Sequence, residues 1–150
     1  MKITLKRVNV FMLLKLPLAY LGGVRVKTLS GDKATVKITH RWMNQNPFKS
    51  MFWAAQGMAA EMSTGVLVMK AIEDSKEKVS MLVTHQEANF YKKATGKIVF
   101  TCAGGKEISA AIKTSKETKE GQVVVLIAEG VNTDGIVVSN FSFEWSLKVK

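Results

Sequence analysis

One carboxylate stands in a segment that is otherwise rich in small and apolar residues. Residues 44–65, NQNPFKSMFWAAQGMAAEMSTG, contain a single acidic residue, Glu61. A carboxylate that lies against apolar groups loses hydration, which raises its pKa and suits it to act as a base near neutral pH. Thr64 follows about one helical turn later, so it shares a helix face with Glu61 and can hold a water there.

Three roles are open for Glu61. The first role is that of a base or nucleophile. The second is to hold a ligand or a water. The third is to form a structural pair with a lysine or the backbone at a dimer interface. The third role is included because charged residues are almost never fully buried without a partner. Functional sites are enriched in carboxylates of this kind, which makes Glu61 the first candidate catalytic residue.

The segment that carries Glu61 predicts a central buried helix over about 50–68. Pro47, directly before it, suits the start of a helical turn. The segment lacks the charged stripe of a surface helix, and a helix that is apolar around its whole circumference is buried. Several residues are small enough for another backbone to approach closely, namely Ala54, Ala55, Gly57, Ala59, Ala60 and Gly65.

The remaining elements predict an α+β fold in one domain, residues 1–150, with an antiparallel sheet of about six strands wrapped around the central helix. Alternating apolar and polar residues indicate the strands, most clearly in the last segment, FSFEWSLKVK. An N-terminal capping helix is expected over about 4–16, and residues 105–121 favour a short exposed helix over a polar strand. The expected strands are a hairpin within 24–39, then 79–91, 97–102, 123–128 and 136–149.

Composition limits the partners and the compartment. The net charge is +10, but the lysines are spread along the chain and no arginine-rich run occurs, which favours a solvated surface over a nucleic-acid groove. Cys102 is the only cysteine, so a cytoplasmic location is expected, with Cys102 as a small buried hydrophobe. The apolar stretch 8–21 is too interrupted to span a membrane or serve as a secretory signal. His40 and His85 lack ligand spacing, so no metal site is predicted.

The order of these elements resembles the hotdog fold of the thioesterase-like superfamily, in a branch related to the phenylacetyl-CoA-type acyl-CoA thioesterases. In that family the loop before the central helix carries an Asn. A His-Gly-Gly follows it at a fixed spacing, and an acidic residue follows the His-Gly-Gly at a second fixed spacing. The same spacing here places Asn46 on the Asn, Phe52, Trp53 and Ala54 on the His-Gly-Gly, and Glu61 on the acid. The resemblance implies that Glu61 and Asn46 are catalytic and that residues 52–54 bind substrate.

Thioester cleavage gives these residue types a physical reason. A base must act near the carbonyl carbon, and donors must face the oxygen that becomes anionic. Glu61 fits the first task, and the free N–H groups at the start of the central helix fit the second. Asn46 positions the carbonyl or the water, or is only a turn residue before Pro47. Phe52 and Trp53, which replace His and Gly, either block the approach of the thioester or line its acyl pocket.

The resemblance also implies how the rest of the substrate and a second chain are bound. Lys92, Lys93 and Lys97, around the turn at Gly96, are candidates for the phosphates of coenzyme A, although an exposed hairpin end explains them equally well. No cofactor is expected beyond a coenzyme A thioester as substrate. A homodimer is implied, with the two sheets joined edge to edge, or a tetramer of such pairs.

Three function classes follow from these observations. The predicted function is a thioesterase that acts on an acyl-CoA or carrier-bound acyl chain. The alternative is a hotdog protein that binds an acyl chain or fatty acid without cleaving it. A basic nucleic-acid-binding domain is the third class and has only the net charge in its favour, so no nucleic-acid partner is predicted.

Overall fold

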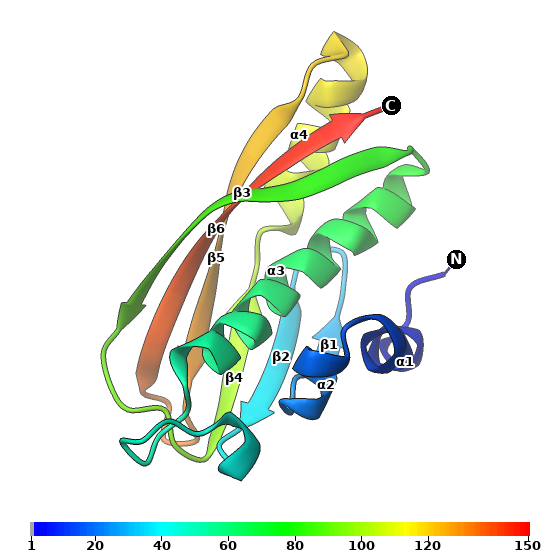
Figure 1. The fold of residues 1–150 in the computed structure, drawn as a ribbon. Coiled ribbons are helices and arrows are strands. Elements are labelled where there is room, and N and C mark those ends of the chain that lie inside the picture. Colours follow the sequence, from blue (N-terminus) through cyan, green and yellow to red (C-terminus); the bar gives the residue numbers. More distant parts are fainter. Residues whose placement is uncertain (1) are drawn as a thin grey trace.

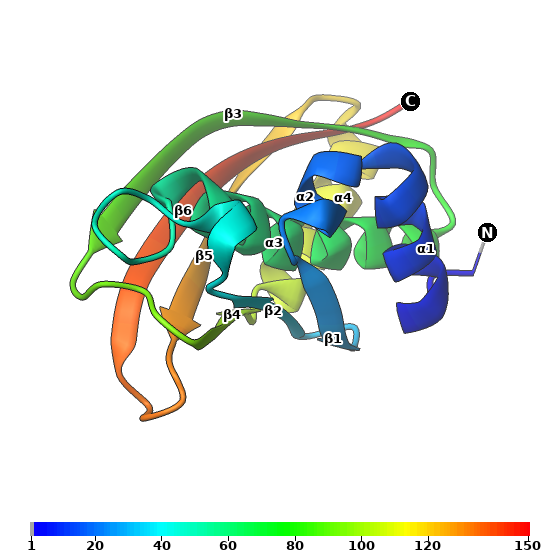
Figure 2. The ribbon, with the colours of Figure 1, turned by 60° about the horizontal axis from the view of Figure 1, so that its bottom comes forward.

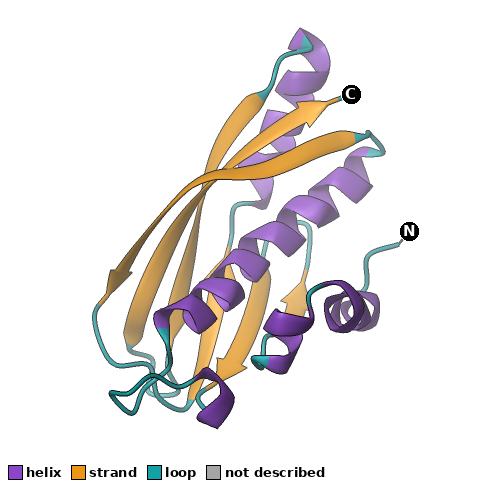
Figure 3. Cartoon of the chain, viewed as in Figure 1, coloured by secondary structure: helices purple, strands orange, loops and turns teal. Residues whose placement is uncertain are grey.

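A six-stranded antiparallel sheet curves around one long helix (Figure 1). The computed structural model describes residues 2–150. All its major helices lie on one side of the sheet (Figure 3), as expected for an α+β layer architecture. The elements in chain order are α1 (Leu5–Lys15), α2 (Pro17–Leu21), β1 (Arg25–Leu29), β2 (Ala34–Thr39), the 3-10 helix η1 (Trp42–Asn44), α3 (Trp53–Ser75), β3 (Val79–Phe90), β4 (Lys97–Cys102), α4 (Gly105–Thr118), β5 (Gln122–Val131) and β6 (Val137–Val149).

The strands run in the spatial order β1-β2-β4-β5-β6-β3, and each pairs antiparallel with its neighbours. The predicted six-stranded antiparallel sheet and the helix inserted after its second strand are therefore confirmed. The strands β1 and β3 form the two edges, and α3 connects β2 to β3 across the sheet (Figure 1). The helix α3 is thus in contact with β1, β2, β4, β5 and β6.

The long helix α3 begins later and ends later than the predicted 50–68. It begins at Trp53 because Met51 forms a β-bridge with Gln45, which holds the preceding residues extended. It ends at Ser75, and the following residue, Lys76, has a left-handed conformation with φ of 59°. The added last turns have a polar side, where Lys70 forms ion pairs with Glu73 and Asp74.

The last strand supplies much of the wall that faces α3. Its inward side chains alternate with outward ones as the sequence predicts, and Phe141, Phe143, Trp145, Leu147 and Val149 are all buried. The rings of Phe141 and Phe143 stack with centroids 6.0 Å apart. Burial of these aromatic side chains supplies a large part of the hydrophobic stabilisation, since each buries roughly 150–250 Å².

The predicted N-terminal helix over 4–16 is present as α1, and a second short helix that the sequence did not indicate, α2, follows it. The break falls at Leu16, directly before Pro17, because a residue that precedes proline disfavours the helical conformation. The helix α1 packs on β1, and the Asn9 side chain donates to the Val26 carbonyl and accepts from the Val26 N–H, both at 3.1 Å. None of the helices within residues 2–150 is long and apolar enough to cross a membrane.

The helix favoured for residues 105–121 is present as α4. Ile108 and Ile112 are buried on its inner side, and the helix packs against α3, β5 and β6. Gly105 begins α4 where the chain passes the turn at Gly31, and a Cβ atom there would lie 2.0 Å from the Gly31 carbonyl oxygen. A glycine is therefore required for this close approach.

Candidate active site

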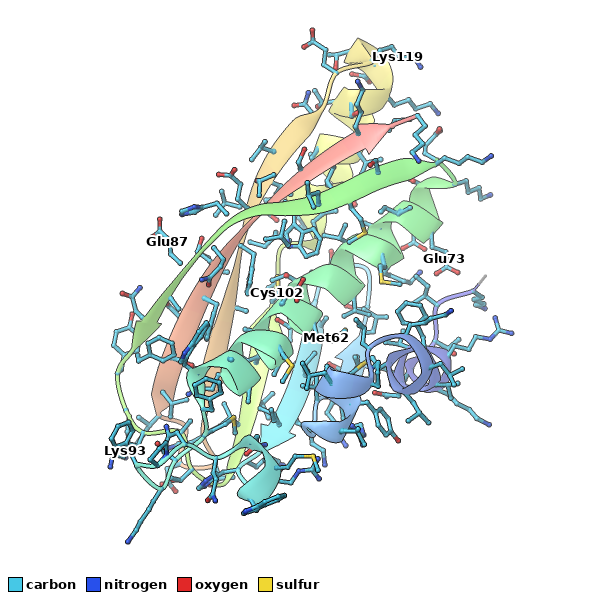
Figure 4. All side chains as sticks on the ribbon, viewed as in Figure 1. Met62, Glu73, Glu87, Lys93, Cys102 and Lys119 are labelled. Carbon is cyan, nitrogen blue, oxygen red and sulfur yellow. The ribbon has the colours of Figure 1, made fainter. Side chains whose placement is uncertain are left out.

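The first turn of α3 opens onto a pocket of about 490 Å³. This pocket lies between the loop before α3 and the segment after β3, at the end of the molecule where Lys93 is found in Figure 4. Its walls combine aromatic and other apolar side chains with several polar ones, which is typical of small-molecule sites. The lining residues are Asn46, Pro47, Phe48, Ser50, Met51, Phe52, Trp53, Gln56, Phe90, Tyr91, Lys92, Lys93 and Ala94.

Asn46 organises the loop that forms one wall of this pocket. Its Oδ1 accepts from the N–H groups of Phe48 and Ser50 at 2.9 and 3.3 Å. Its Nδ2 donates to the Ser50 hydroxyl at 3.1 Å and to the Met51 carbonyl at 3.4 Å. These contacts are those of a turn residue. Asn46 lines the pocket, but the loop already uses both ends of its amide.

Phe52 and Trp53 stand at the mouth of the pocket and remain about half exposed, at 46% and 53%. Their ring centroids lie 5.9 Å apart at an interplanar angle of 60°. Phe52 occupies the cap position of α3 and forms no side-chain cap hydrogen bond. The N–H groups of Trp53 and Ala54 precede the first helical hydrogen bonds, which run from Ala55 and Gln56 to the Phe52 carbonyl. These two donors carry the positive end of the helix dipole.

Gln56 is a buried polar residue at the base of the pocket. Its Oε1 accepts from the Ser139 hydroxyl at 2.8 Å, and its Nε2 donates to the Met51 carbonyl at 3.4 Å. The sequence suggests only an amide at the edge of the core for this position. Buried polar groups are normally hydrogen-bonded, and this pair fixes the first turn of α3 to β6.

The lysine candidates separate into two groups. Lys92 and Lys93 line the pocket, and the Lys93 ammonium donates to the Phe48 carbonyl at 3.1 Å. Lys97 begins β4 on the far side of the Gly96 turn and is exposed outside the residues that line the pocket. Sequence reasoning missed Phe48, Phe90 and Tyr91. These three side chains are 51–69% exposed. They lie in loops and at the end of a strand, where no helical or strand periodicity marks them as part of a site.

Glu61 lies apart from the pocket, and the expectation that it is buried is wrong for the single chain. It is exposed, while Ala60, Ser63 and Thr64 beside it are buried. Eight residues of helix separate it from Trp53, which corresponds to about 12 Å at 1.5 Å per residue. The strands contact mainly the other sides of α3, and β6 approaches this side at Gly57 and Gly65, where an added Cβ would lie 3.5 Å from the rings of Phe141 and Trp145. Nearby atoms still remove part of the hydration of the carboxylate, and this desolvation raises the pKa of Glu61 above its ordinary value.

Thr64 is also occupied by protein contacts. Its hydroxyl accepts from the Trp145 indole N–H at 3.0 Å and donates to the Glu61 carbonyl at 2.8 Å. Thr64 is fully buried, so it lies toward β6 and is not beside the exposed Glu61 carboxylate. Ala54 is half-buried in the first turn of α3, on the same open side as Glu61.

The other titratable candidates lie away from the pocket. Burial is the main factor that raises the pKa of the Cys102 thiol, so the thiolate that could act as a nucleophile is disfavoured. His85 pairs with Glu87 at 3.0 Å on the exposed side of β3. Within residues 2–150, no three His, Cys, Asp or Glu side chains are grouped as they would be around a metal ion.

Comparisons with known proteins assign the chain to a family. Residues 5–147 match the model of a domain of unknown function, DUF4442. The comparison with curated proteins gave no match.

Three solved structures share the fold at low sequence identity. A Pseudomonas aeruginosa protein of unknown function, described as a probable thioesterase, is 18% identical with a TM-score of 0.84, and the match covers 100% of this chain and 99% of that one. A Chlorobaculum tepidum protein of unknown function is 18% identical with a TM-score of 0.83 and coverage of 97% and 94%. A thioesterase from Haemophilus influenzae is 11% identical with a TM-score of 0.75 and coverage of 99% and 93%. The chain therefore belongs to the DUF4442 family, and its fold is the hotdog fold of the thioesterase-like proteins.

Proposed function

We propose that this protein hydrolyses an acyl thioester, carried by coenzyme A or by an acyl-carrier protein. The observation that supports it most is the uncapped start of α3, which opens onto an aromatic pocket with two lysines in its wall. The fold shared with thioesterases supports the expectation of thioester hydrolysis. The fold alone does not assign the reaction, because one fold hosts many functions.

The N–H groups of Trp53 and Ala54 are the proposed oxyanion donors. In thioester hydrolysis the carbonyl oxygen gains negative charge in the transition state, and preorganised donors stabilise that charge more than the ground state. Backbone donors do not depend on side-chain identity. Phe52 and Trp53 can therefore replace the smaller residues of the related thioesterases and still leave the donors in place.

The two ends of the substrate fit different walls of the pocket. The acyl group packs against the exposed rings of Phe48, Phe52 and Trp53, which lose water on contact. Lys92 and Lys93 supply positive charge for the phosphates of the carrier. Asn46 holds the loop wall that positions the acyl group, which makes it a positioning residue in this proposal.

Glu61 requires a second copy of the chain to reach the thioester. Within one chain it lies about 12 Å along the helix from the Trp53 N–H. The strand β3 pairs only with β6 and offers its other edge for strand pairing. Half-buried small residues next to Glu61, Ala54 and Gly57, allow close approach. A homodimer joined at the β3 edges would cover the Glu61 side of each α3 and bring Glu61 of one copy toward the pocket of the other.

In this proposed site Glu61 acts as a base. Its carboxylate takes a proton from a water, the resulting hydroxide attacks the carbonyl carbon, and the Trp53 and Ala54 N–H groups hold the oxyanion. Collapse of the tetrahedral intermediate breaks the C–S bond, and the proton on Glu61 passes to the departing thiolate. Covering by a second chain would raise the pKa of Glu61 further and bring it closer to neutral pH. The reducing compartment indicated by Cys102 makes the cytoplasm the proposed location.

Release of free thiol from a panel of acyl-CoA substrates tests the proposal. Glu61→Gln is expected to lower kcat roughly 100-fold to 10,000-fold, the usual contribution of a positioned base. Glu129→Gln, which changes an exposed glutamate on the outer side of β5, is the matched control and should retain full activity. An unchanged rate for Glu61→Gln would remove Glu61 from the chemistry.

Subunit mixing tests whether the site is shared between copies. Glu61→Gln and a pocket variant, Lys92→Glu with Lys93→Glu, are each expected to be inactive. Refolded together in equal amounts, they should recover about a quarter of wild-type activity, because half of the dimers are mixed and each has one intact site. No recovery would place Glu61 and the lysines in the same chain's site.

The alternative is a protein that binds an acyl chain or fatty acid without cleaving it. The separation of Glu61 from the pocket within one chain favours this alternative. It predicts saturable binding of a fluorescent fatty acid that Trp53→Ala weakens, with no thiol release from any acyl-CoA of the panel.

A further inference from the structure

The outward side of the N-terminal helices is apolar, where an ordinary surface helix is polar. Leu14 and Leu18 are 70% and 75% exposed, and Val10 and Leu21 are about half exposed. Contiguous exposed apolar surface of this kind marks an interaction site more often than a free surface.

These side chains are held outward by the fold. The inner side of α1 is fixed by Val8 and Met12, which are buried in the core. The paired hydrogen bonds between Asn9 and Val26 attach the same side of α1 to β1. The helices α1 and α2 lie together beside β1 (Figure 2). The exposed leucines therefore belong to a rigid element and not to a frayed terminus.

Cations border the apolar side chains of α1. A shallow depression of about 600 Å³ lies on its outward side, where Val10, Phe11 and Leu14 form the apolar part. Lys6, Arg7 and Lys15 line the same depression. Lysine and arginine side chains next to exposed aliphatic groups form the pattern of helices that lie in the plane of a membrane interface.

The same pattern continues from the end of α2 to η1. A second depression, of about 390 Å³, is lined by Tyr20, Leu21, Arg25, Arg41, Trp42 and Met43. Trp42 is 80% exposed, and the Arg41 guanidinium donates to the Leu21 carbonyl, which links η1 to α2. Tryptophan is enriched at the boundary between lipid headgroups and acyl chains. We call α1, α2 and η1 together the N-terminal surface.

The net positive charge of the protein is concentrated in the first 60 residues, the part of the chain that carries this surface. Residues 1–60 contain ten lysines and arginines and one carboxylate, Asp32, whereas residues 61–150 contain twelve cations and eleven carboxylates. The lysines are spread along the chain, but the carboxylates are not. The ion pairs formed within residues 2–150 involve Lys70, His85 and Lys116, all outside the N-terminal surface.

We propose that the N-terminal surface docks the protein on a bilayer that contains anionic phospholipid. Leu14, Leu18 and Trp42 enter the boundary between headgroups and acyl chains, and the lysines and arginines bind lipid phosphates. Exposed aliphatic groups bordered by cations, with no carboxylate in α1, α2 or η1, complement a bilayer that presents acyl chains beneath anionic phosphates. This docking does not depend on the proposed hydrolysis.

Vesicle flotation tests the docking with the full chain. Wild type is expected to float with vesicles of phosphatidylcholine and phosphatidylglycerol, to bind phosphatidylcholine alone far less, and to dissociate as salt is raised. Leu14→Glu with Leu18→Glu should lower the partition coefficient on the order of tenfold or more. The matched control, Val125→Glu with Ile127→Glu, changes exposed apolar residues of β5 and should bind as wild type does. Equal melting temperatures for both double variants show that each remains folded.

Tryptophan emission provides a second measurement. Anionic vesicles should shift the emission of wild type to shorter wavelength, and Trp42→Phe should remove most of that shift. Failure of wild type to bind anionic vesicles, or binding that the leucine variant retains, overturns the proposal. A lower native mass of the leucine variant in solution would instead assign the surface to a second copy of the chain. Binding to duplex DNA in place of vesicles would assign the cations to nucleic acid.

Discussion

The start and the middle of α3 meet their surroundings in different ways. At the start, Asn46 and Gln56 have their hydrogen bonds satisfied by the same chain, and the pocket is complete in one copy. In the middle, Glu61 is exposed on a side of the helix that faces away from the core. An apolar helix can therefore be enclosed at one end by its own chain and remain open farther along. The open part is where a second chain is expected.

The largest effect is expected from a bulky charge on the open side of α3. Gly57→Arg should abolish the proposed homodimer and lower thiol release roughly 100-fold or more, because it separates Glu61 from the pocket of the other copy. Sedimentation velocity and thiol release are measured on the same samples. A Cβ at Gly57 lies 3.5 Å from the Phe141 ring, an ordinary contact, so Gly57→Ala is the control and should retain both dimer and activity.

Removal of the buried hydrogen bond between Thr64 of α3 and Trp145 of β6 is expected to lower stability substantially. Thr64→Val removes the acceptor of the Trp145 indole N–H and should lower the free energy of unfolding by about 1–3 kcal/mol. Thr64→Ser keeps the hydroxyl and should restore most of that loss. Urea unfolding measures both. Equal stability of the Val and Ser variants would show that Trp145 finds another acceptor.

A substitution in the loop that forms one wall of the pocket should affect substrate binding more than the chemical step. Asn46→Ala removes the acceptor of the Phe48 and Ser50 N–H groups and should cost about 1 kcal/mol of stability, as capping residues do. We expect KM for acyl-CoA to rise while kcat changes little, because in the proposed site this loop holds the acyl group. A fall in kcat comparable to that of Glu61→Gln would instead make Asn46 a catalytic residue.

The smallest effect concerns the pH dependence of stability. The pKa of Glu61 is raised in the folded chain, so the native state binds more protons than the unfolded state, and stability from this group falls as pH rises through that pKa. Glu61→Gln should therefore be slightly more stable than wild type at pH 7, by less than about 1 kcal/mol because the carboxylate is exposed. The difference should disappear below the ordinary pKa of 4.5. Urea unfolding between pH 4 and 8 checks the sign.

The fold was more predictable than the site because periodic patterns report burial directly. The alternation of residues 141–149 located β6, and the small residues of 54–60 located the central helix. The late start of α3 depends on one β-bridge, which leaves little trace in periodicity.

The site was only partly predictable because it depends on contacts distant in sequence. The sequence and the resemblance name Asn46, Phe52, Trp53, Lys92 and Lys93 as site candidates, and in the structure all five line one pocket, while their roles stay predictions. The pairing of Gln56 with Ser139 spans 83 residues and has no local signal. The exposure of Glu61 depends on which strands reach that side of α3, which only the three-dimensional arrangement decides.

The amide of Asn9 also determines how copies of this protein can assemble. By occupying the main-chain N–H and carbonyl of Val26, it closes one border of the sheet to strand addition, while β3 remains available at the other. A sheet with two open borders can extend without limit into a fibre. With a single open border, addition would stop after one partner, so the proposed self-assembly through this sheet would end in a closed pair.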